Sequence, residues 1–242
     1  MKEKVINAYD KLAGDYERHV DSQSGHNAYY ERPAMIHLLP ANMEQMTVLD
    51  AGCAAGWYTE QFLKRGARVT AVDLSPAMVE ACKRRVGNEA TVFACDITED
   101  LPFEDEAFDL IVSSLTLHYI EDWAETFREF QRVLKPGGSL IYSVHHPFMD
   151  VKHFDRQDYF ARELLTEVWN KPESGPVEVS FYRRPIQEII NVTSSRFRID
   201  QLIEPQPSLA DKDNPEAKEW MAKWYVRLMM NPHFLIVKAQ KS

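Results

Sequence analysis

Short runs of Val, Ile and Leu recur along the middle of this chain, and helical patterns separate them. The runs are TVLDAG, ARVTAVD, ATVFACD, FDLIVSS and SLIYSVHH, which begin at Thr47, Ala67, Ala90, Phe108 and Ser139. They are apolar almost throughout, which is typical of strands that are buried on both faces. Residues 57–64 and 123–134 have helical spacing, and Ser75 with Pro76 marks the start of another helix. This alternation predicts an α/β fold with a doubly wound, parallel sheet.

The segments on either side of these runs have other patterns. Residues 1–40 read as two polar helical stretches, interrupted at Ser22–Gly25 and ended by Pro40. The KPGG sequence reads as a turn, and residues 148–180 mix aromatic, charged, Pro and Gly residues without a period. Further along, we expect a helix over 185–193, a strand over 197–205, a helix over about 215–227 and a last strand over 232–240.

Carboxylates follow three successive predicted strands. Asp50, Asp73 and Asp96 stand at the carboxyl ends of the first, second and third strands, and a glycine turn from Gly52 to Gly56 follows Asp50. A single Asp in such a place is often a turn former or a helix cap. In an open α/β sheet, however, ligands bind beyond the carboxyl ends of the strands. The pattern therefore predicts a ligand site there, with Asp73 placed to reach a ribose diol.

The glycine turn favours one kind of nucleotide over another. Its pattern is D-x-G-x-x-x-G, whereas the dinucleotide fingerprint G-x-G-x-x-G seats a pyrophosphate. A carboxylate beside the turn repels a pyrophosphate and suits an ammonium group. We therefore expect an adenosine ligand that carries an amino acid. The formal charge of −9 also disfavours binding to the phosphates of nucleic acids.

Three stretches of sequence give this chain a family resemblance. They are VLDAGCAAGWYTEQFLKRGARVTAVDLSPAMVEACKRR, FACDITEDLPFEDEAFDLIVSSLTLHYIEDW and EFQRVLKPGGSLIYSV. Together they closely resemble class I S-adenosylmethionine-dependent methyltransferases, in the small-molecule group that includes the ubiquinone and menaquinone enzymes. The likeness is strong over residues 47–145 and weaker at YDKLAGDY. It implies a Rossmann-like, seven-stranded, mostly parallel sheet with an antiparallel last strand, N-terminal helices and an insertion after the fifth strand.

The resemblance implies a role for residues at every strand end. Asp50 and the turn through Gly52, Ala54 and Gly56 would hold the methionine part of S-adenosylmethionine. Asp73 would bind the ribose, and Leu74, Met78, Asp96 and Ile97 would surround the adenine. The remaining implied cofactor contacts are Ser113, Leu115, Tyr9, Tyr16 and Arg32. Ala54 stands where the family usually has glycine, and we expect its Cβ to require a negative φ.

Histidines near the strand ends are the candidates for acid–base chemistry. A general base is needed only if the acceptor loses a proton during transfer. His145 and His118 are the catalytic candidates, with His146 a weaker one, and packing roles remain open for all three. The run HHPFMDVKH brings His145, His146, His153 and Asp150 together without metal-ligand spacing, so we expect no metal site.

The acceptor pocket should come from the segments that the cofactor core leaves unused. The core is expected over about 47–145 and 197–240, and the lid and substrate elements over 1–46 and 146–196, all in one domain of 242 residues. The second lid segment is rich in aromatic residues, and Arg183 and Arg184 are candidates for an anion anchor.

Other functions remain open at this point. A non-catalytic S-adenosylmethionine-binding protein is one, and a nicotinamide-dependent oxidoreductase is another. A nucleic-acid methyltransferase is disfavoured by the acidic charge, and the text SSLTLHYI lacks the Asn/Asp-Pro-Pro-aromatic motif of many DNA enzymes. The sequence shows no apolar leader, no span of ~18 apolar residues and no paired cysteines. We therefore expect a cytoplasmic monomer or homodimer that acts on a small molecule.

Overall fold

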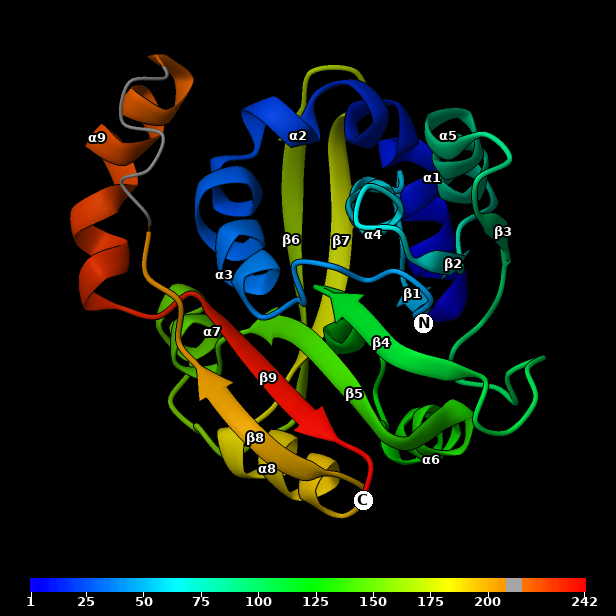
Figure 1. The fold of residues 1–242 in the computed structure, drawn as a ribbon. Helices are drawn as coiled ribbons and strands as arrows, with labels where there is room; N and C mark the ends of the chain where they lie inside the picture. Colours follow the sequence, from blue (N-terminus) through cyan, green and yellow to red (C-terminus); the bar gives the residue numbers. More distant parts are fainter. Residues whose placement is uncertain (208–214) are drawn as a thin grey trace.

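The fold is built on one large, mostly parallel sheet. The structure is a computed structural model and describes residues 1–207 and 215–242. Seven strands pair in the order β3-β2-β1-β4-β5-β9-β8, and β9 runs antiparallel to both of its neighbours (Figure 1). Their bounds are β1 Thr47–Ala51, β2 Arg68–Asp73, β3 Thr91–Ala94, β4 Phe108–Ser114, β5 Leu134–His145, β8 Arg198–Ile203 and β9 Phe234–Gln240. The expected fold class, including the antiparallel last strand, is confirmed.

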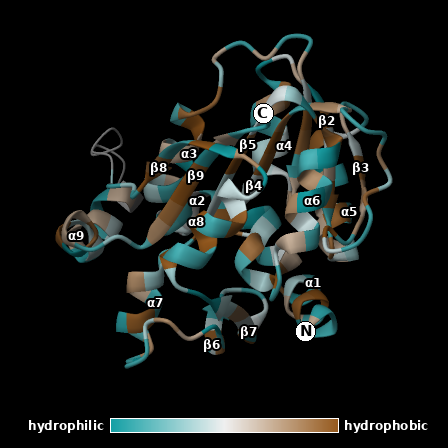
Figure 2. Cartoon of the chain, turned by 90° about the horizontal axis from the view of Figure 1, so that it is seen from below, coloured by the Kyte–Doolittle hydropathy of each residue, from teal (hydrophilic) through white to brown (hydrophobic). Residues whose placement is uncertain are grey.

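Both faces of the sheet are buried, which explains the continuous apolar runs. On β1, Val48 packs into one core cluster and Leu49 into another. The helices α3 (Arg32–His37) and α4 (Trp57–Leu63) cover the face of Val48, while α6 (Ala124–Val133) and α8 (Ile186–Ser194) cover the face of Leu49. The strands in the middle of the molecule are correspondingly coloured as hydrophobic (Figure 2). Because strand side chains alternate between faces, each strand must be apolar at nearly every position.

The observed helices begin and end within a few residues of the predicted boundaries. Helix α5 (Pro76–Val86) begins after Ser75, whose Oγ accepts a hydrogen bond from the Met78 N–H, and Pro76 is its first residue. Helix α1 covers Lys2–Arg18, and α9 covers Pro215–Met230 at the outer margin of the molecule in both views. The N-terminal helical region continues through α2 (Val20–Gln23), so the expected break at Ser22–Gly25 starts later, at Ser24.

One prediction about a turn is wrong, and a segment for which no structure was predicted folds into regular elements. KPGG is not a free turn, because β5 runs through it and its pairing with β4 jumps from Phe108–Leu134 to Leu110–Ser139. Residues 148–180, which showed no period, form helix α7 (Pro147–His153) and most of an antiparallel hairpin, β6 (Glu163–Lys171) with β7 (Gly175–Arg183). Polar residues are frequent in this hairpin because it belongs to a second sheet with one exposed side.

The hairpin and helix α1 share a separate apolar cluster at the end of the large sheet. Leu165, Val179 and Phe181 of the hairpin pack against Ala8 and Leu12 of α1. Both views place α1 beside the hairpin (Figures 1 and 2). The division into a core (47–145 and 197–240) and lid segments (1–46 and 146–196) stays a proposal. Helices α3 and α8 of those lid segments lie on the sheet, and residues 208–214 of the proposed core lie outside the described residues.

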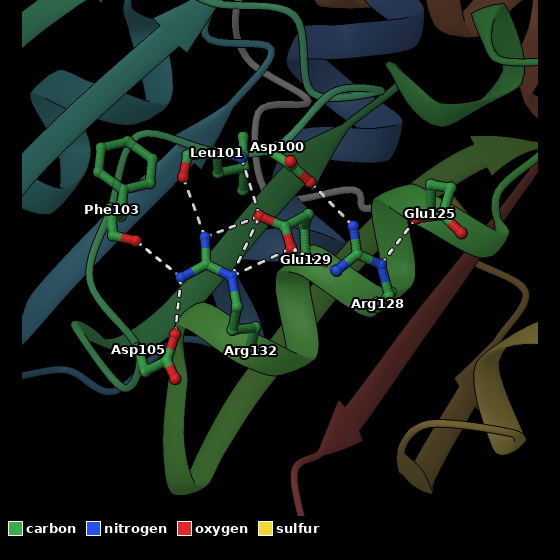
Figure 3. A network of polar contacts seen from close by, with 8 residues as sticks. All are labelled: Asp100, Leu101, Phe103, Asp105, Glu125, Arg128, Glu129 and Arg132. Atoms are coloured by element: carbon green, nitrogen blue, oxygen red, sulfur yellow. Dashed lines mark hydrogen bonds and ion pairs between the residues drawn. The ribbon is translucent and has the colours of Figure 1, made fainter.

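A polar network anchors the loop that follows β3. Glu129 of α6 is only 1% exposed, and its carboxylate accepts hydrogen bonds from the Leu101 N–H at 2.8 Å and from Arg132 at 2.7 Å (Figure 3). Arg132 also donates to the carbonyl oxygens of Leu101 and Phe103. The loop of residues 95–107 carries Asp96 and Ile97, so this network holds one border of the predicted ligand site in place.

Replacing Glu129 tests the strength of this anchor. Glu129→Gln removes the charge and one of two acceptor oxygens, and we expect the free energy of unfolding to fall by about 1–3 kcal/mol. The hydrogen bond from Arg132 lowers the pKa of Glu129 in the folded protein. Its stabilisation is therefore present at neutral pH and is lost as the pH falls through that pKa, so the two proteins should converge in acid.

Chemical denaturation at several pH values measures this difference. Glu125→Gln is the matched control, because Glu125 lies on the same helix and pairs with Arg128 in an exposed ion pair. It should change stability little. Equal losses for the two variants would contradict an anchoring role for Glu129.

Within the described residues, no helix is long and apolar enough to cross a membrane.

Candidate functional site

A large cavity lies at the carboxyl ends of the parallel strands. Its volume is about 530 Å³, and it is lined from the turns after β1, β2, β3 and β4, from the end of β5, and from α1 and the β6–β7 hairpin. The strand order reverses between β1 and β4, which is the switch point where open α/β sheets bind ligands. A cavity of this size suits a drug-sized ligand.

The turn after β1 forms one wall, and one expectation about it is wrong. Gly52 and Ala54 both line the cavity, with φ values of 91° and 45°. Ala54 therefore adopts the left-handed conformation, not the negative φ that we expected. The Ala54 N–H donates a hydrogen bond to Asp73 Oδ2 at 2.9 Å, and this bond holds the turn in its strained form. Leu115, also in the wall, is left-handed as well, with φ 49°.

Asp73 occupies the position predicted for it, at the cavity edge after β2. Its Oδ1 accepts a hydrogen bond from the Ser75 N–H and its Oδ2 accepts one from the Ala54 N–H, each at 2.9 Å. Burial raises the pKa of Asp73 to about 6, even though these hydrogen bonds oppose the shift. Carboxylate oxygens have further lone pairs, so Asp73 can still accept hydrogen bonds from a ligand.

The loop after β3 supplies a second border of the cavity. Asp96 and Ile97 line it, as does Leu74 from the turn after β2. Strand β3 ends at Ala94, so Asp96 belongs to the loop and not to the strand end. Asp96 Oδ2 lies 2.7 Å from Lys2 Nζ of helix α1. Although burial opposes the change, hydrogen bonds from Lys2 and Thr98 lower the pKa of Asp96.

Four of the predicted cofactor contacts do not line the cavity. Asp50 is buried in β1, where its carboxylate accepts a hydrogen bond from Thr59 Oγ1 at 2.6 Å and burial raises its pKa to about 7. Met78 packs in the α1–hairpin cluster, and Ser113 Oγ donates to the Ala51 carbonyl oxygen. Gly56 starts α4 behind the wall, where a Cβ would come within 2.7 Å of Cys82 Sγ. These residues therefore support the cavity wall without lining the cavity.

Helix α1 and the segment after it close the cavity. Tyr9 and Tyr16 of α1 line it, and the Tyr9 hydroxyl donates a hydrogen bond to the Tyr119 hydroxyl at 2.6 Å. Arg32 also lines it, 7% exposed, with its guanidinium 4.2 Å from the Trp57 ring and 3.0 Å from Asp21. The structure therefore brings the expected N-terminal residues to the cavity.

A buried carboxylate that sequence reasoning missed fastens this N-terminal segment. Glu31 ends a π-helix, Asn27–Glu31, and it accepts hydrogen bonds from the hydroxyls of Tyr58, Ser114 and Ser143 at 2.8, 2.8 and 2.5 Å. Burial raises the pKa of Glu31. A π-helix often marks a functional site. Nothing in the local sequence around Glu31 signals this, because its partners come from other elements.

Histidine rings form the other end of the cavity. The rings of His118 and His145 stack with centroids 4.1 Å apart, and His233 and His26 also line the cavity. Burial lowers the pKa of His118 to about 3 and of His26 to about 4, and it lowers the pKa of His145 and His233 well below their usual value. These imidazoles are therefore neutral near pH 7. Sequence reasoning identified His118 and His145 but missed the other two.

Three polar candidates near this end do not line the cavity, and for His146 the packing role that was left open is the one observed. Arg183 and Arg184 do not line the cavity: Arg183 bonds to Glu163 and to backbone oxygens, and Arg184 pairs with Glu188. They cannot anchor a ligand while so engaged. His146 also lies outside the cavity wall, where its Nδ1 accepts a hydrogen bond from the Phe148 N–H and so caps α7.

The histidines do not combine with other ligands into a metal centre. Across residues 1–207 and 215–242, no group of three or more His, Cys, Asp or Glu side chains is arranged to hold an ion. His145 Nδ1 instead lies 3.6 Å from Asp150 Oδ1, and Asp150 also lines the cavity.

Known proteins resemble this chain in both sequence and structure. Residues 49–142 match the family described as a methyltransferase domain. An uncharacterized protein of Haemophilus influenzae is 27% identical over 234 residues, which cover 89% of this chain and 88% of that protein. Malonyl-[acyl-carrier protein] O-methyltransferase of Erwinia pyrifoliae is 34% identical over 142 residues, which cover 59% of this chain and 51% of that enzyme. The match thus spans about half the length of the Erwinia enzyme.

Solved structures show the same likeness. The structure of a candidate S-adenosylmethionine-dependent methyltransferase from Listeria monocytogenes has a TM-score of 0.71 and 28% identity, and the match covers 88% of this chain and 96% of that one. An S-adenosylmethionine-dependent methyltransferase from Mesorhizobium loti has a TM-score of 0.65 and 25% identity, over 87% of this chain and 97% of that one.

The left-handed Ala54 leads to a prediction about stability. Ala54→Gly removes a Cβ that is strained at positive φ, and we expect it to raise the free energy of unfolding by on the order of 1 kcal/mol. Ala55→Gly is the matched control, because Ala55 has no such φ and should lose about 0.4–1 kcal/mol. Thermal unfolding of both variants measures the two changes in stability. If Ala54→Gly lowers the free energy of unfolding as much as Ala55→Gly does, Ala54 is not strained.

Proposed function

Because this chain is a class I S-adenosylmethionine-dependent methyltransferase, we propose that it methylates a small molecule held between the cofactor and the histidine rings. The observation that carries this proposal is the continuity of the cavity. Asp73 and the left-handed turn at Ala54 line one end of it, and His118 and His145 line the other. An acceptor among these rings would therefore share one cavity with the cofactor.

The adenosine part would lie over the ends of β2 and β3. We assign Asp73 to the two ribose hydroxyls, because a carboxylate can accept a hydrogen bond from each. Leu74 and Ile97 would contact the faces of the adenine. Asp96 would accept a hydrogen bond from the adenine amine, and its ion pair with Lys2 would bring helix α1 over the base.

The methionine part would lie along the turn of Gly52 and Ala54, beneath Tyr9 and Tyr16. Arg32 would attract its carboxylate. A buried donor without a partner supports this assignment. Arg85 lines the same wall, and its Nη1 is buried without a hydrogen-bond partner among the described residues. When bound, S-adenosylmethionine supplies an electrophilic methyl group that an acceptor nucleophile takes by in-line attack.

The protein's own contribution is to orient the two partners, exclude water and take up a proton. We assign proton uptake to His145 Nε2. Burial and the neighbouring His118 keep the pKa of His145 low, so its ring is unprotonated and has a lone pair available across physiological pH. Asp150, 3.6 Å from Nδ1, would orient the ring. His118, stacked on His145, would position the acceptor.

The nature of the acceptor is part of this proposal. The formal charge of −9 favours a small molecule over a nucleic acid. The malonyl-[acyl-carrier protein] enzymes match over only about half their length, so their substrate is not carried over to this chain. We further propose that the enzyme acts in the cytoplasm, as a monomer or homodimer.

The pH dependence of cofactor binding tests the role of Asp73. Isothermal titration with S-adenosylhomocysteine should give constant affinity above pH 7. Below about pH 6 the Asp73 carboxyl is protonated, so the affinity should fall by about tenfold per pH unit. Asp73→Asn should weaken binding at pH 8 by about 1–3 kcal/mol and flatten the profile. The exposed Glu104→Gln variant is the control and should behave as the native protein does.

A profile that keeps its slope in Asp73→Asn would assign the pH dependence to another group.

Methyl transfer itself is tested by incubating the enzyme with methyl-labelled S-adenosylmethionine and a small-molecule extract. We expect a labelled product, and His145→Ala should lower kcat by about 10²–10⁴-fold if the acceptor loses a proton, while the KM for the cofactor stays unchanged. Cofactor binding without any transfer would favour a non-catalytic binding protein.

A further inference from the structure

Two positive side chains line the acceptor end of the cavity without a carboxylate partner. They are Lys171 at the end of β6 and Arg227 of α9. Among the described residues, neither is within ion-pair distance of an acid. The other cations at the cavity differ in this respect: Arg32 and Arg85 pair with Asp21, and Lys2 pairs with Asp96. Lys171 and Arg227 therefore have positive charge available for a ligand.

The surroundings of these two cations are apolar and aromatic. The Arg227 guanidinium lies 5.2 Å from the Trp224 ring, and its Nη2 lies 3.9 Å from Met149 Sδ. Lys171 Nζ lies 5.6 Å from the Trp169 ring, and burial lowers the pKa of Lys171. A partly buried cation without a partner costs free energy, and a bound anion removes that cost.

His26 adds a neutral donor to the lining of the same cavity. Its Nδ1 accepts a hydrogen bond from Trp220 Nε1–H at 3.4 Å, so the ring proton is on Nε2. Nε2 is buried and has no hydrogen-bond partner among the described residues. Besides burial, the charges of Arg227, Lys171 and Lys223 keep the pKa of His26 low. Through Trp224, whose ring contacts both His26 and Arg227, the His26 ring lies close to one of the two cations that line the cavity.

The acids that face this end of the cavity are already engaged or favour the neutral form. Glu167 bonds to Trp169 Nε1–H and lies 3.6 Å from His153 Nε2. Burial raises the pKa of Asp150 well above its usual value. Asp15 accepts hydrogen bonds from the backbone of residues 173 and 174. These acids offset part of the positive charge, but none of them forms an ion pair with Lys171 or Arg227 among the described residues.

We propose that the methyl acceptor is a flat molecule with an anionic oxygen group, a carboxylate or phosphate, which Lys171, Arg227 and the His26 Nε2–H bind. This proposal rests on the proposed function of the same cavity. The rings of His145, His233 and His26 follow one another, with centroids 6.5 and 4.8 Å apart. The anionic group therefore lies at the end of the cavity away from His118 and Leu115, and the nucleophile lies at the opposite end of the molecule.

Matched acids and neutral analogues test the inference on the complex with S-adenosylhomocysteine. The probes are benzoate with benzamide, 4-hydroxybenzoate with 4-hydroxybenzamide, and phenyl phosphate with phenol, each measured by isothermal titration. We expect at least one anion to bind about tenfold or more tightly than its neutral partner. Comparing the benzoates with phenyl phosphate distinguishes a carboxylate site from a phosphate site.

Variants identify the groups responsible. Lys171→Met with Arg227→Met should reduce the affinity for the anion to that for its neutral analogue, and the affinity for S-adenosylhomocysteine should stay unchanged. Lys171→Gln with Arg227→Gln repeats the test if the methionine pair does not fold. Lys218→Met is the matched control, because Lys218 is an exposed cation on the same helix that does not line the cavity, and it should bind as the native protein does.

Equal affinity for anions and neutral analogues, absence of binding by all three anions, or an unchanged anion preference in the double variant would each overturn the proposal. S-adenosylhomocysteine binding in the same samples separates this outcome from failure of the proposed function. If the native protein binds S-adenosylhomocysteine but shows no anion preference, only the anionic acceptor is refuted. If it does not bind S-adenosylhomocysteine, the cofactor site itself is refuted.

Discussion

The partly buried carboxylate of Asp73 connects the parts on which the site depends. It accepts one backbone hydrogen bond from the turn after β1 and one from the turn after β2. Ser75, in the second turn, donates through its hydroxyl to Asp10 of α1, so the same corner also holds the closing helix. Burying this charge is unfavourable, as its raised pKa shows, and the two N–H groups offset part of that cost. Two turns and one helix are thereby held around a single carboxylate.

A second buried carboxylate fixes the opposite side of the cavity. Glu31 joins the N-terminal segment to the ends of β4 and β5 through the hydroxyls of Ser114 and Ser143. The same segment places His26 beside Trp224 and His233, from the C-terminal part of the chain. The acceptor end is therefore made by elements that are far apart in sequence, and the anchored Glu31 helps to hold them together. This is a polar constraint in a region whose other contacts are mainly between rings.

The strands and the cofactor edge could be predicted because their signals are local. Apolar runs that are buried on both faces have a clear pattern, and parallel strands bring their carboxyl ends to one edge, so Asp73, Leu74 and Ile97 meet at the cavity as expected. Two predictions failed for non-local reasons. Ala54 is left-handed because Asp73, 19 residues away, holds its N–H. The KPGG segment joins β5 through pairing with β4. The hairpin, for which no structure was predicted, also depends on a distant element, because it folds against α1.

The sequence by itself determined the α/β sheet, the glycine turn and the acids around it, because each arises from neighbours along the chain. It did not determine which of those residues reach the ligand: Asp50 and Ser113 hydrogen-bond to their surroundings behind the wall. Only the tertiary structure decided the character of the acceptor end. Burial makes its histidines neutral. Folding pairs Arg183 and Arg184 with acids, whereas Lys171 and Arg227 have no acid partner in the part of the chain that the structure describes. Charge and protonation depend on what surrounds a group in space, and sequence spacing does not specify that environment.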